Sequence, residues 1–162
     1  MRLFIAIEFT DKMLQALKDI QRQMRRQGVR GNFTPEENLH LTLAFIGEYP
    51  DPDPVLDVIH ALPVEPFELS LDGFGNFGNL WWTGLERSEA LNSYVKSLRH
   101  GLADAGIPFD RKRFSPHITL VRKADFIIPP QIQVPKAAMT VDHICLFRSD
   151  RGRHDMIYTE IQ

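Results

Sequence analysis

The chain has little cysteine, no long apolar run and no marked excess of either charge. Cys145 is the single cysteine among 162 residues, which excludes an intramolecular disulfide and a zinc site built from several cysteines. It lies in an apolar run, so we expect a buried and unreactive thiol. No stretch approaches the length of a membrane span, and the first apolar stretch is too short for a signal peptide. We therefore expect a soluble, cytoplasmic protein with no membrane partner.

The formal net charge of −2 argues against the indiscriminate binding of polyanions that strongly basic domains show. Any phosphate recognition must therefore be local. Four short basic clusters are present: Arg25 with Arg26, Arg111 to Arg113, Arg122 with Lys123, and Arg148 with Arg151 and Arg153. The first fits the last turn of an amphipathic helix, where cations offset the helix dipole.

Hydrophobic periodicity predicts more strands than helices. Strands are expected at residues 3–8, 40–46, 67–71, 80–85 and 117–121, with two more near 139–147 and 155–161. Helices are expected from Thr10 or Asp11, from about Pro54, and from Leu91 to Ala105. The glycine-rich stretch 72–79 is interpreted as a link between two strands. This mixed order predicts an α+β fold with largely antiparallel pairing, and no linker divides residues 1–162 into separate domains.

A tetrapeptide of the form His-x-Thr-x occurs once in each half of the chain, at residues 40–43 and 117–120. In a strand, alternate side chains share a face, so each His and Thr project together, roughly 7 Å apart, while the aliphatic residues anchor the other face. Strand structure alone would explain one copy. Two matched copies favour a shared active site.

Two imidazoles and two hydroxyls around a small anion suit phosphodiester cleavage. Neutral imidazole accepts a proton, imidazolium donates one, and threonine hydroxyls donate to phosphate oxygens. Arg122 is a further phosphate-binding candidate, although alternation places it opposite His117 unless the strand ends or twists there. A metal site lacks a third ligand at diagnostic spacing, so we expect neither a metal nor a cofactor.

The two motifs and their surroundings resemble the 2H phosphoesterase superfamily, and within it the bacterial and archaeal RNA 2′,3′-cyclic phosphodiesterases, also named 2′-5′ RNA ligases. The similarity includes residues 2–7, 38–48 and 114–122 and covers essentially the whole chain, while Phe33 stands where relatives often carry tryptophan. The resemblance implies a bilobal α+β fold in which two antiparallel sheets, related by a pseudo-two-fold axis, face a central cleft. Helices would lie outside, with one motif in each lobe.

The resemblance also implies metal-independent hydrolysis of an RNA terminal 2′,3′-cyclic phosphate to a 2′-phosphomonoester, with 2′-5′ RNA ligation as the reverse direction. His40 would be the proton donor and His117 the proton acceptor, while Thr42, Thr119 and Arg122 would bind phosphate. The expected partner is an RNA end or a small nucleotide, bound by a monomer. Two alternatives stay open. One is a phosphodiesterase for small cyclic nucleotides, ADP-ribose cyclic phosphate or 2′-5′ oligoadenylate, and the other is a non-catalytic binder of RNA ends or nucleotides.

Overall fold

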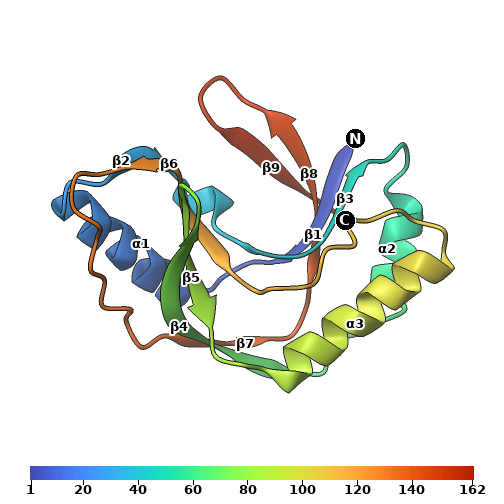
Figure 1. Ribbon diagram of the computed structural model, residues 1–162. Coiled ribbons are helices and arrows are strands. Elements are labelled where there is room, and N and C mark those ends of the chain that lie inside the picture. Colours follow the sequence, from blue (N-terminus) through green and yellow to red (C-terminus); the bar gives the residue numbers. More distant parts are fainter.

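Two antiparallel sheets and three α-helices form the fold of the computed structural model, which describes residues 1–162 (Figure 1). The first sheet has the order β3-β1-β8-β9 and contains β1 (Arg2–Ile7), β3 (Leu41–Glu48), β8 (Cys145–Arg151) and β9 (Met156–Ile161). The second has the order β2-β6-β5-β4-β7 and contains β2 (Arg30–Phe33), β4 (Phe67–Phe77), β5 (Leu80–Leu85), β6 (Ile118–Asp125) and β7 (Ala138–Val141). The helices are α1 (Asp11–Arg26), α2 (Asp53–His60) and α3 (Glu89–Asp104), with a 3-10 turn η1 (Glu36–Asn38). The predicted α+β class is confirmed.

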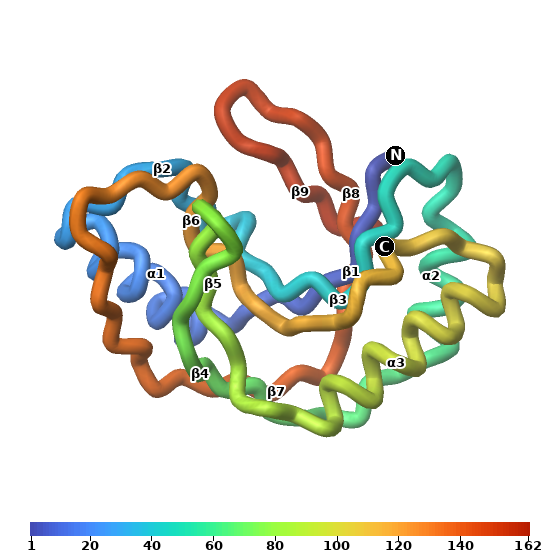
Figure 2. Tube along the Cα trace, in the orientation of Figure 1, coloured from blue at the N-terminus to red at the C-terminus, as the bar shows by residue number.

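Each sheet is covered by helices on its outer side (Figure 2). The apolar faces of α2 and α3 pack against β1 and β3 in one core cluster. In a second cluster α1 packs against β6, and its predicted stripe supplies Met13, Leu17, Ile20 and Met24. Thr10 begins α1 as predicted, because its hydroxyl accepts a hydrogen bond from the Met13 amide. The inner sides of the sheets are thereby left to face each other.

Strand β1 is buried on both faces because it lies in the middle of the first sheet. Leu3, Ile5 and Ile7 point toward the helices, whereas Phe4 and Ala6 belong to a small cluster on the inner face. This explains why the N-terminal strand reads as an almost continuous apolar run.

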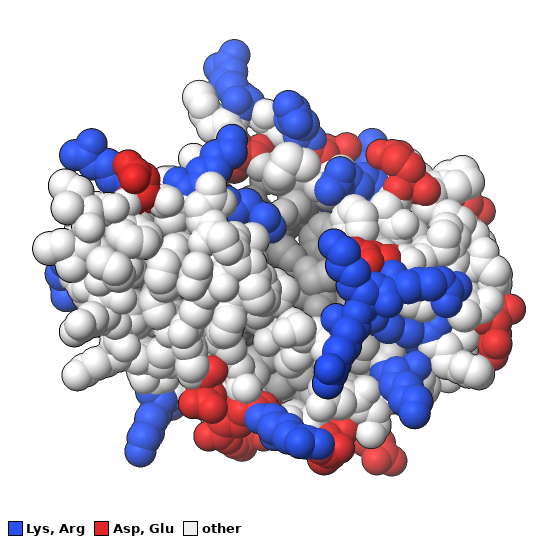
Figure 3. Space-filling model, in the orientation of Figure 1, with Lys and Arg blue, Asp and Glu red and all other residues white.

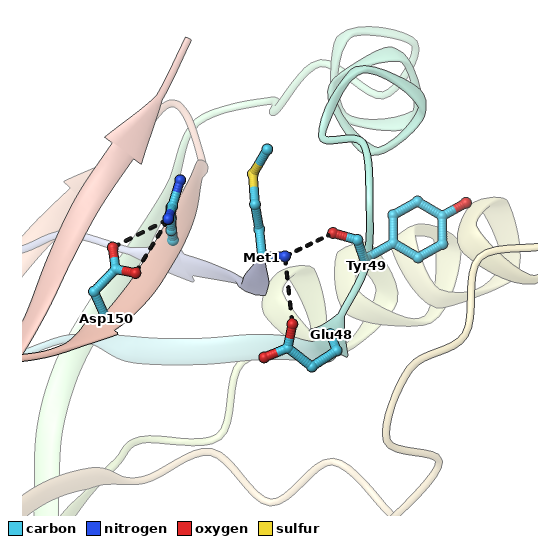
Figure 4. Close-up of polar contacts among 5 residues, drawn as sticks. Met1, Glu48, Tyr49 and Asp150 are labelled. Atoms are coloured by element: carbon cyan, nitrogen blue, oxygen red, sulfur yellow. Dashed lines mark hydrogen bonds and ion pairs between the residues drawn. The ribbon is translucent and has the colours of Figure 1, made fainter.

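The start of β1 is fastened to the end of β3. The amino group of Met1 donates a hydrogen bond to the Tyr49 carbonyl oxygen at 3.2 Å and pairs with the Glu48 carboxylate at 3.3 Å (Figure 4). The Tyr49 amide donates in return to the Met1 carbonyl oxygen at 2.7 Å. These contacts agree with the register of the two strands, in which Arg2 faces Glu48.

The interpretation of the glycine-rich stretch 72–79 as a link is wrong for most of its length, because β4 continues to Phe77. Only glycine fits at position 75, because the Trp82 indole of β5 lies across the backbone there. A Cβ would come within 2.7 Å of the ring. Gly75 therefore allows β4 to run beneath the Trp82 ring.

Two further elements differ from the sequence prediction. Strand β2 was not expected, since its sequence Arg-Gly-Asn-Phe has no apolar alternation. The predicted strand near residues 139–147 is two strands, because the chain leaves the second sheet after β7 and enters the first at β8. No helix of the structure combines the length and the apolar character needed to cross a membrane.

Candidate active site

The five predicted site residues line one hollow of about 130 Å³. They are His40, Thr42, His117, Thr119 and Arg122. We call this hollow the motif cavity; its lining consists of Thr34, Asn38, His40, Thr42, His117, Thr119, Arg122 and Tyr158. His40, Thr42 and Tyr158 come from the first sheet and its approach, and His117, Thr119 and Arg122 from the second. The cavity therefore exists only where the two sheets meet.

The aliphatic residues of each motif act as anchors, as the alternation predicts. Leu41 and Leu43 of β3 are completely buried in the first core cluster, and Ile118 and Leu120 of β6 are completely buried in the second. The histidines themselves directly precede the two strands, which begin at Leu41 and Ile118. Fixed backbones therefore present the four polar side chains to the cavity.

The same hydrogen bond orients both imidazoles. Nδ1–H of His40 donates to the Asn38 carbonyl oxygen at 2.7 Å, and Nδ1–H of His117 donates to the Ser115 carbonyl oxygen at 2.7 Å. A carbonyl can only accept, so Nδ1 carries the proton in each neutral ring and Nε2 is left for chemistry. Nε2 of His40 lies 2.8 Å from the Thr42 hydroxyl oxygen. The neutral ring accepts that hydroxyl's hydrogen bond, whereas the imidazolium would donate to it.

The two histidines differ in their surroundings. His40 packs between Phe4, at 5.0 Å between ring centroids, and the edge of Tyr158, at 5.4 Å. Burial lowers the pKa of His40 below its ordinary value of 6.5, and the nearby charges of Arg122 and His117 add to this effect against the opposing Asn38 hydrogen bond. His117 instead meets the ring of Phe77 edge-on at 5.2 Å. The site is thus chemically asymmetric despite its repeated motif.

A β-bulge brings Arg122 to the motif face. Trp81 and Trp82 are consecutive on β5, but their partners on β6 are Val121 and Thr119, so β6 carries one extra residue there. Consequently Leu120 and Val121 are both completely buried, and Arg122 returns to the cavity side. The simple alternation that placed Arg122 opposite His117 is wrong, and the bulge supplies the required irregularity.

Three cavity residues were not among the predicted site residues. The Asn38 side-chain amide donates to the Met156 carbonyl oxygen at 2.8 Å and so ties η1 to β9. The Thr34 hydroxyl donates to the Thr119 carbonyl oxygen at 3.1 Å. Tyr158 reaches the cavity from β9. The alternation within the two motifs gives no signal for these three residues, because their positions depend on pairing between distant segments.

One other cluster has ligand-type side chains, at Glu8, Cys145 and Glu160, whose atoms lie within 4.8 Å of one another. The Cys145 side chain is buried, as predicted, and burial together with both carboxylates raises the pKa of its thiol to about 12. Burial and Glu160 also raise the pKa of Glu8. None of the three residues lines the motif cavity.

Comparison with known proteins identifies the family. The family model described as the 2'-5' RNA ligase superfamily matches residues 11–153. The chain belongs to the 2'-5' RNA ligase superfamily. The resemblance inferred from the two motifs is therefore confirmed, and both motifs lie inside the matched region.

Several relatives in this superfamily are RNA 2',3'-cyclic phosphodiesterases. The one from Thermus thermophilus is 32% identical over an alignment covering 100% of this chain and 88% of that protein. The one from Geobacillus stearothermophilus is 30% identical over 91% of this chain, which spans only 52% of that longer protein. The crystal structure of E. coli LigT complexed with 3'-AMP matches with a TM-score of 0.81 and 25% identity, covering 99% of this chain and 95% of that one. The fold and the family are thus established together.

Proposed function

We propose that the protein hydrolyses the 2′,3′-cyclic phosphate at the end of an RNA to a 2′-phosphomonoester, and that it does so without a metal ion. The observation that carries the proposal is the convergence of both His-x-Thr-x motifs and Arg122 on one small cavity. The activity of its relatives and the 3'-AMP complex of E. coli LigT support a nucleotide substrate.

In this reaction water attacks phosphorus and the P–O3′ bond breaks. His117 Nε2 takes the proton of the attacking water, and the His40 imidazolium donates its Nε2 proton to the departing O3′. Thr42, Thr119 and Arg122 hold the non-bridging oxygens, whose negative charge grows in the transition state. With a 5′-hydroxyl in place of water, the same groups break the same P–O3′ bond and leave a 2′-5′ phosphodiester, so ligation is ring opening by an alcohol.

The asymmetry of the site constrains how this division of roles can operate. The lowered pKa of His40 disfavours its imidazolium in the free protein, so this acid gains its proton as the substrate binds. The bound phosphodiester is an anion, so its arrival favours the imidazolium form of His40. Nε2 of His117 makes no hydrogen bond within the protein and is free to meet water.

The proposal is tested with an oligoribonucleotide ending in a 2′,3′-cyclic phosphate, in EDTA, with the product identified by mass spectrometry and comparison with 2′- and 3′-phosphate standards. We expect the 2′-phosphate at an undiminished rate. Loss of one proton-transfer group costs about 10²–10⁴-fold, so His40→Ala and His117→Ala should each lower kcat by that factor.

The control variant is His100→Ala, which alters an exposed histidine on α3. It should keep wild-type activity. Binding of the 2′-phosphate product separates catalysis from mere binding, because both catalytic variants should retain it within a few-fold. A 3′-phosphate product, or activity that disappears in EDTA, would refute the proposal.

A further inference from the structure

A larger hollow of about 870 Å³ adjoins the motif cavity, and Thr34, Asn38, Arg122 and Tyr158 line both. It runs between the end of α1 with β2 on one side and the turn of the β8–β9 hairpin on the other. We call it the basic groove, because its lining includes Arg25, Arg30, Arg122, Arg151, Arg153 and His154.

The charge of this groove contrasts with that of the whole protein. Acidic residues outnumber Lys and Arg by 21 to 19 in the chain, yet Asp155 is the single carboxylate that lines the groove. Arg30, Arg151 and Arg153 form no ion pair within the protein, although Arg148, nearby on β8, pairs with Asp150. Basic side chains gather on the hairpin and along the upper edge of the hollow between the sheets (Figure 3). Such unpaired arginines are available to phosphates.

The opposite wall offers a surface for stacking. The Arg25 guanidinium lies over the Phe33 ring at 4.1 Å from its centroid, and both residues line the groove. Aromatic rings and guanidinium planes together bind single-stranded nucleic acid, since bases stack on them while cations track the backbone.

We propose that the basic groove binds the phosphates of the RNA strand on the 5′ side of the cyclic end. This rests on the proposed function: a terminal cyclic phosphate held in the motif cavity leaves only a 5′ continuation, and the groove begins at residues that line that cavity. The preferred substrate is accordingly a single-stranded oligonucleotide and not a mononucleotide.

The test compares kcat/KM for a single-stranded oligoribonucleotide 2′,3′-cyclic phosphate and for a mononucleotide 2′,3′-cyclic phosphate. At low salt, wild-type protein should favour the oligonucleotide at least tenfold. The double variant Arg151→Gln/Arg153→Gln should lose most of that preference and hydrolyse the mononucleotide normally. The matched control is Arg87→Gln/Lys96→Gln, which removes two exposed cations outside the groove and should behave as wild type.

Salt supplies a second readout. Each phosphate contact contributes about −0.7 to the slope of log affinity against log salt for single strands, so loss of two contacts should make that slope about 1.4 shallower. Binding of an oligoribonucleotide ending in a 2′-phosphate measures it without turnover.

The outcomes separate the two proposals. Equal kcat/KM for both substrates, with no effect of the double variant, overturns the groove assignment and leaves the proposed function standing. Hydrolysis of neither substrate refutes the proposed function, and the binding slope then decides the groove alone. A preference for duplex over single-stranded ends would also overturn the inference, because it removes the role of the stacking wall.

Discussion

At the scale of single residues, the two motif histidines share a backbone device and differ in environment. A carbonyl two positions earlier fixes Nδ1–H of each ring. Burial lowers the pKa of His40, and the charges of Arg122 and His117 lower it further. Acid and base roles can therefore arise from packing around an otherwise symmetric pair.

This environment predicts how activity depends on pH. If His40 donates the proton, activity falls as pH rises through its pKa, and for the free enzyme this limb of the kcat/KM profile should lie below 6.5. Arg122→Gln removes a charge that lowers that pKa, so the limb should move to higher pH. It should also lower kcat/KM about tenfold or more, because a hydrogen bond to a charged group contributes about 1.5–3 kcal/mol.

The control for this prediction is Lys123→Gln, which removes the neighbouring cation whose side chain does not line the motif cavity. Its profile should match that of the wild type. An alkaline limb that stays in place or moves to lower pH in Arg122→Gln would contradict the assignment of His40 as the acid.

The motifs could be predicted from the sequence because the spacing within each strand fixes what its side chains share. The remainder of the cavity could not. Asn38 is held by its hydrogen bond to the Met156 carbonyl oxygen, and Thr34 by its hydrogen bond to the Thr119 carbonyl oxygen. Both bonds join segments that are far apart in the chain. Local patterns carry no record of such pairing, so these residues emerge only once the sheets are assembled.

At the scale of elements, β6 is shaped by its neighbours. The extra residue opposite Trp81 and Trp82 turns Arg122 toward the cavity, and Lys123 follows with a φ of 53°. Strand β2 then lies so close that a Cβ on Gly31 would be 2.9 Å from both the Arg122 carbonyl oxygen and the Val121 side chain. The bulge and the glycine thus act together, and neither could be inferred from alternation.

Gly31→Ala should accordingly destabilise the fold. Overpacking of this kind costs about 1–3 kcal/mol, which for a chain of this size lowers Tm by several degrees. Because the clash falls on the Arg122 backbone, kcat/KM should fall as well. Asn32→Ala, an exposed change on the same strand, should leave Tm within about a degree and serves as the control. Unchanged Tm and activity in Gly31→Ala would show that β2 can move away freely.

At the scale of the whole molecule, each half of the chain contributes strands to both sheets. The first half of the sequence gives β2 to the second sheet, and the last segment gives β8 and β9 to the first. We propose that residues 1–162 form one bilobal folding unit with the motif at 40–43 in one lobe and the motif at 117–120 in the other. No single cut between the motifs would leave two complete sheets.

Two natural probes can test this cooperativity. Both tryptophans, Trp81 and Trp82, lie on β5 in the second sheet, whereas the single cysteine, Cys145, is buried on β8 in the first. During denaturant unfolding, tryptophan fluorescence and thiol labelling of Cys145 should give the same midpoint. Labelling that begins at clearly lower denaturant than the fluorescence change would show that the sheets unfold separately.

The position of β1 also bears on how the protein is made. β1 is hydrogen-bonded to β3 on one side and to β8 on the other, and Phe147 and Cys145 of β8 join Phe4 and Ala6 of β1 in the inner cluster. On the ribosome, β3 follows soon after β1, but β8 is synthesised much later. The edge of β1 that pairs with β8 therefore stays unpaired through most of translation. Unpaired edges of apolar strands are prone to aggregation. We expect the nascent chain to depend on chaperones that shield this edge until β8 emerges.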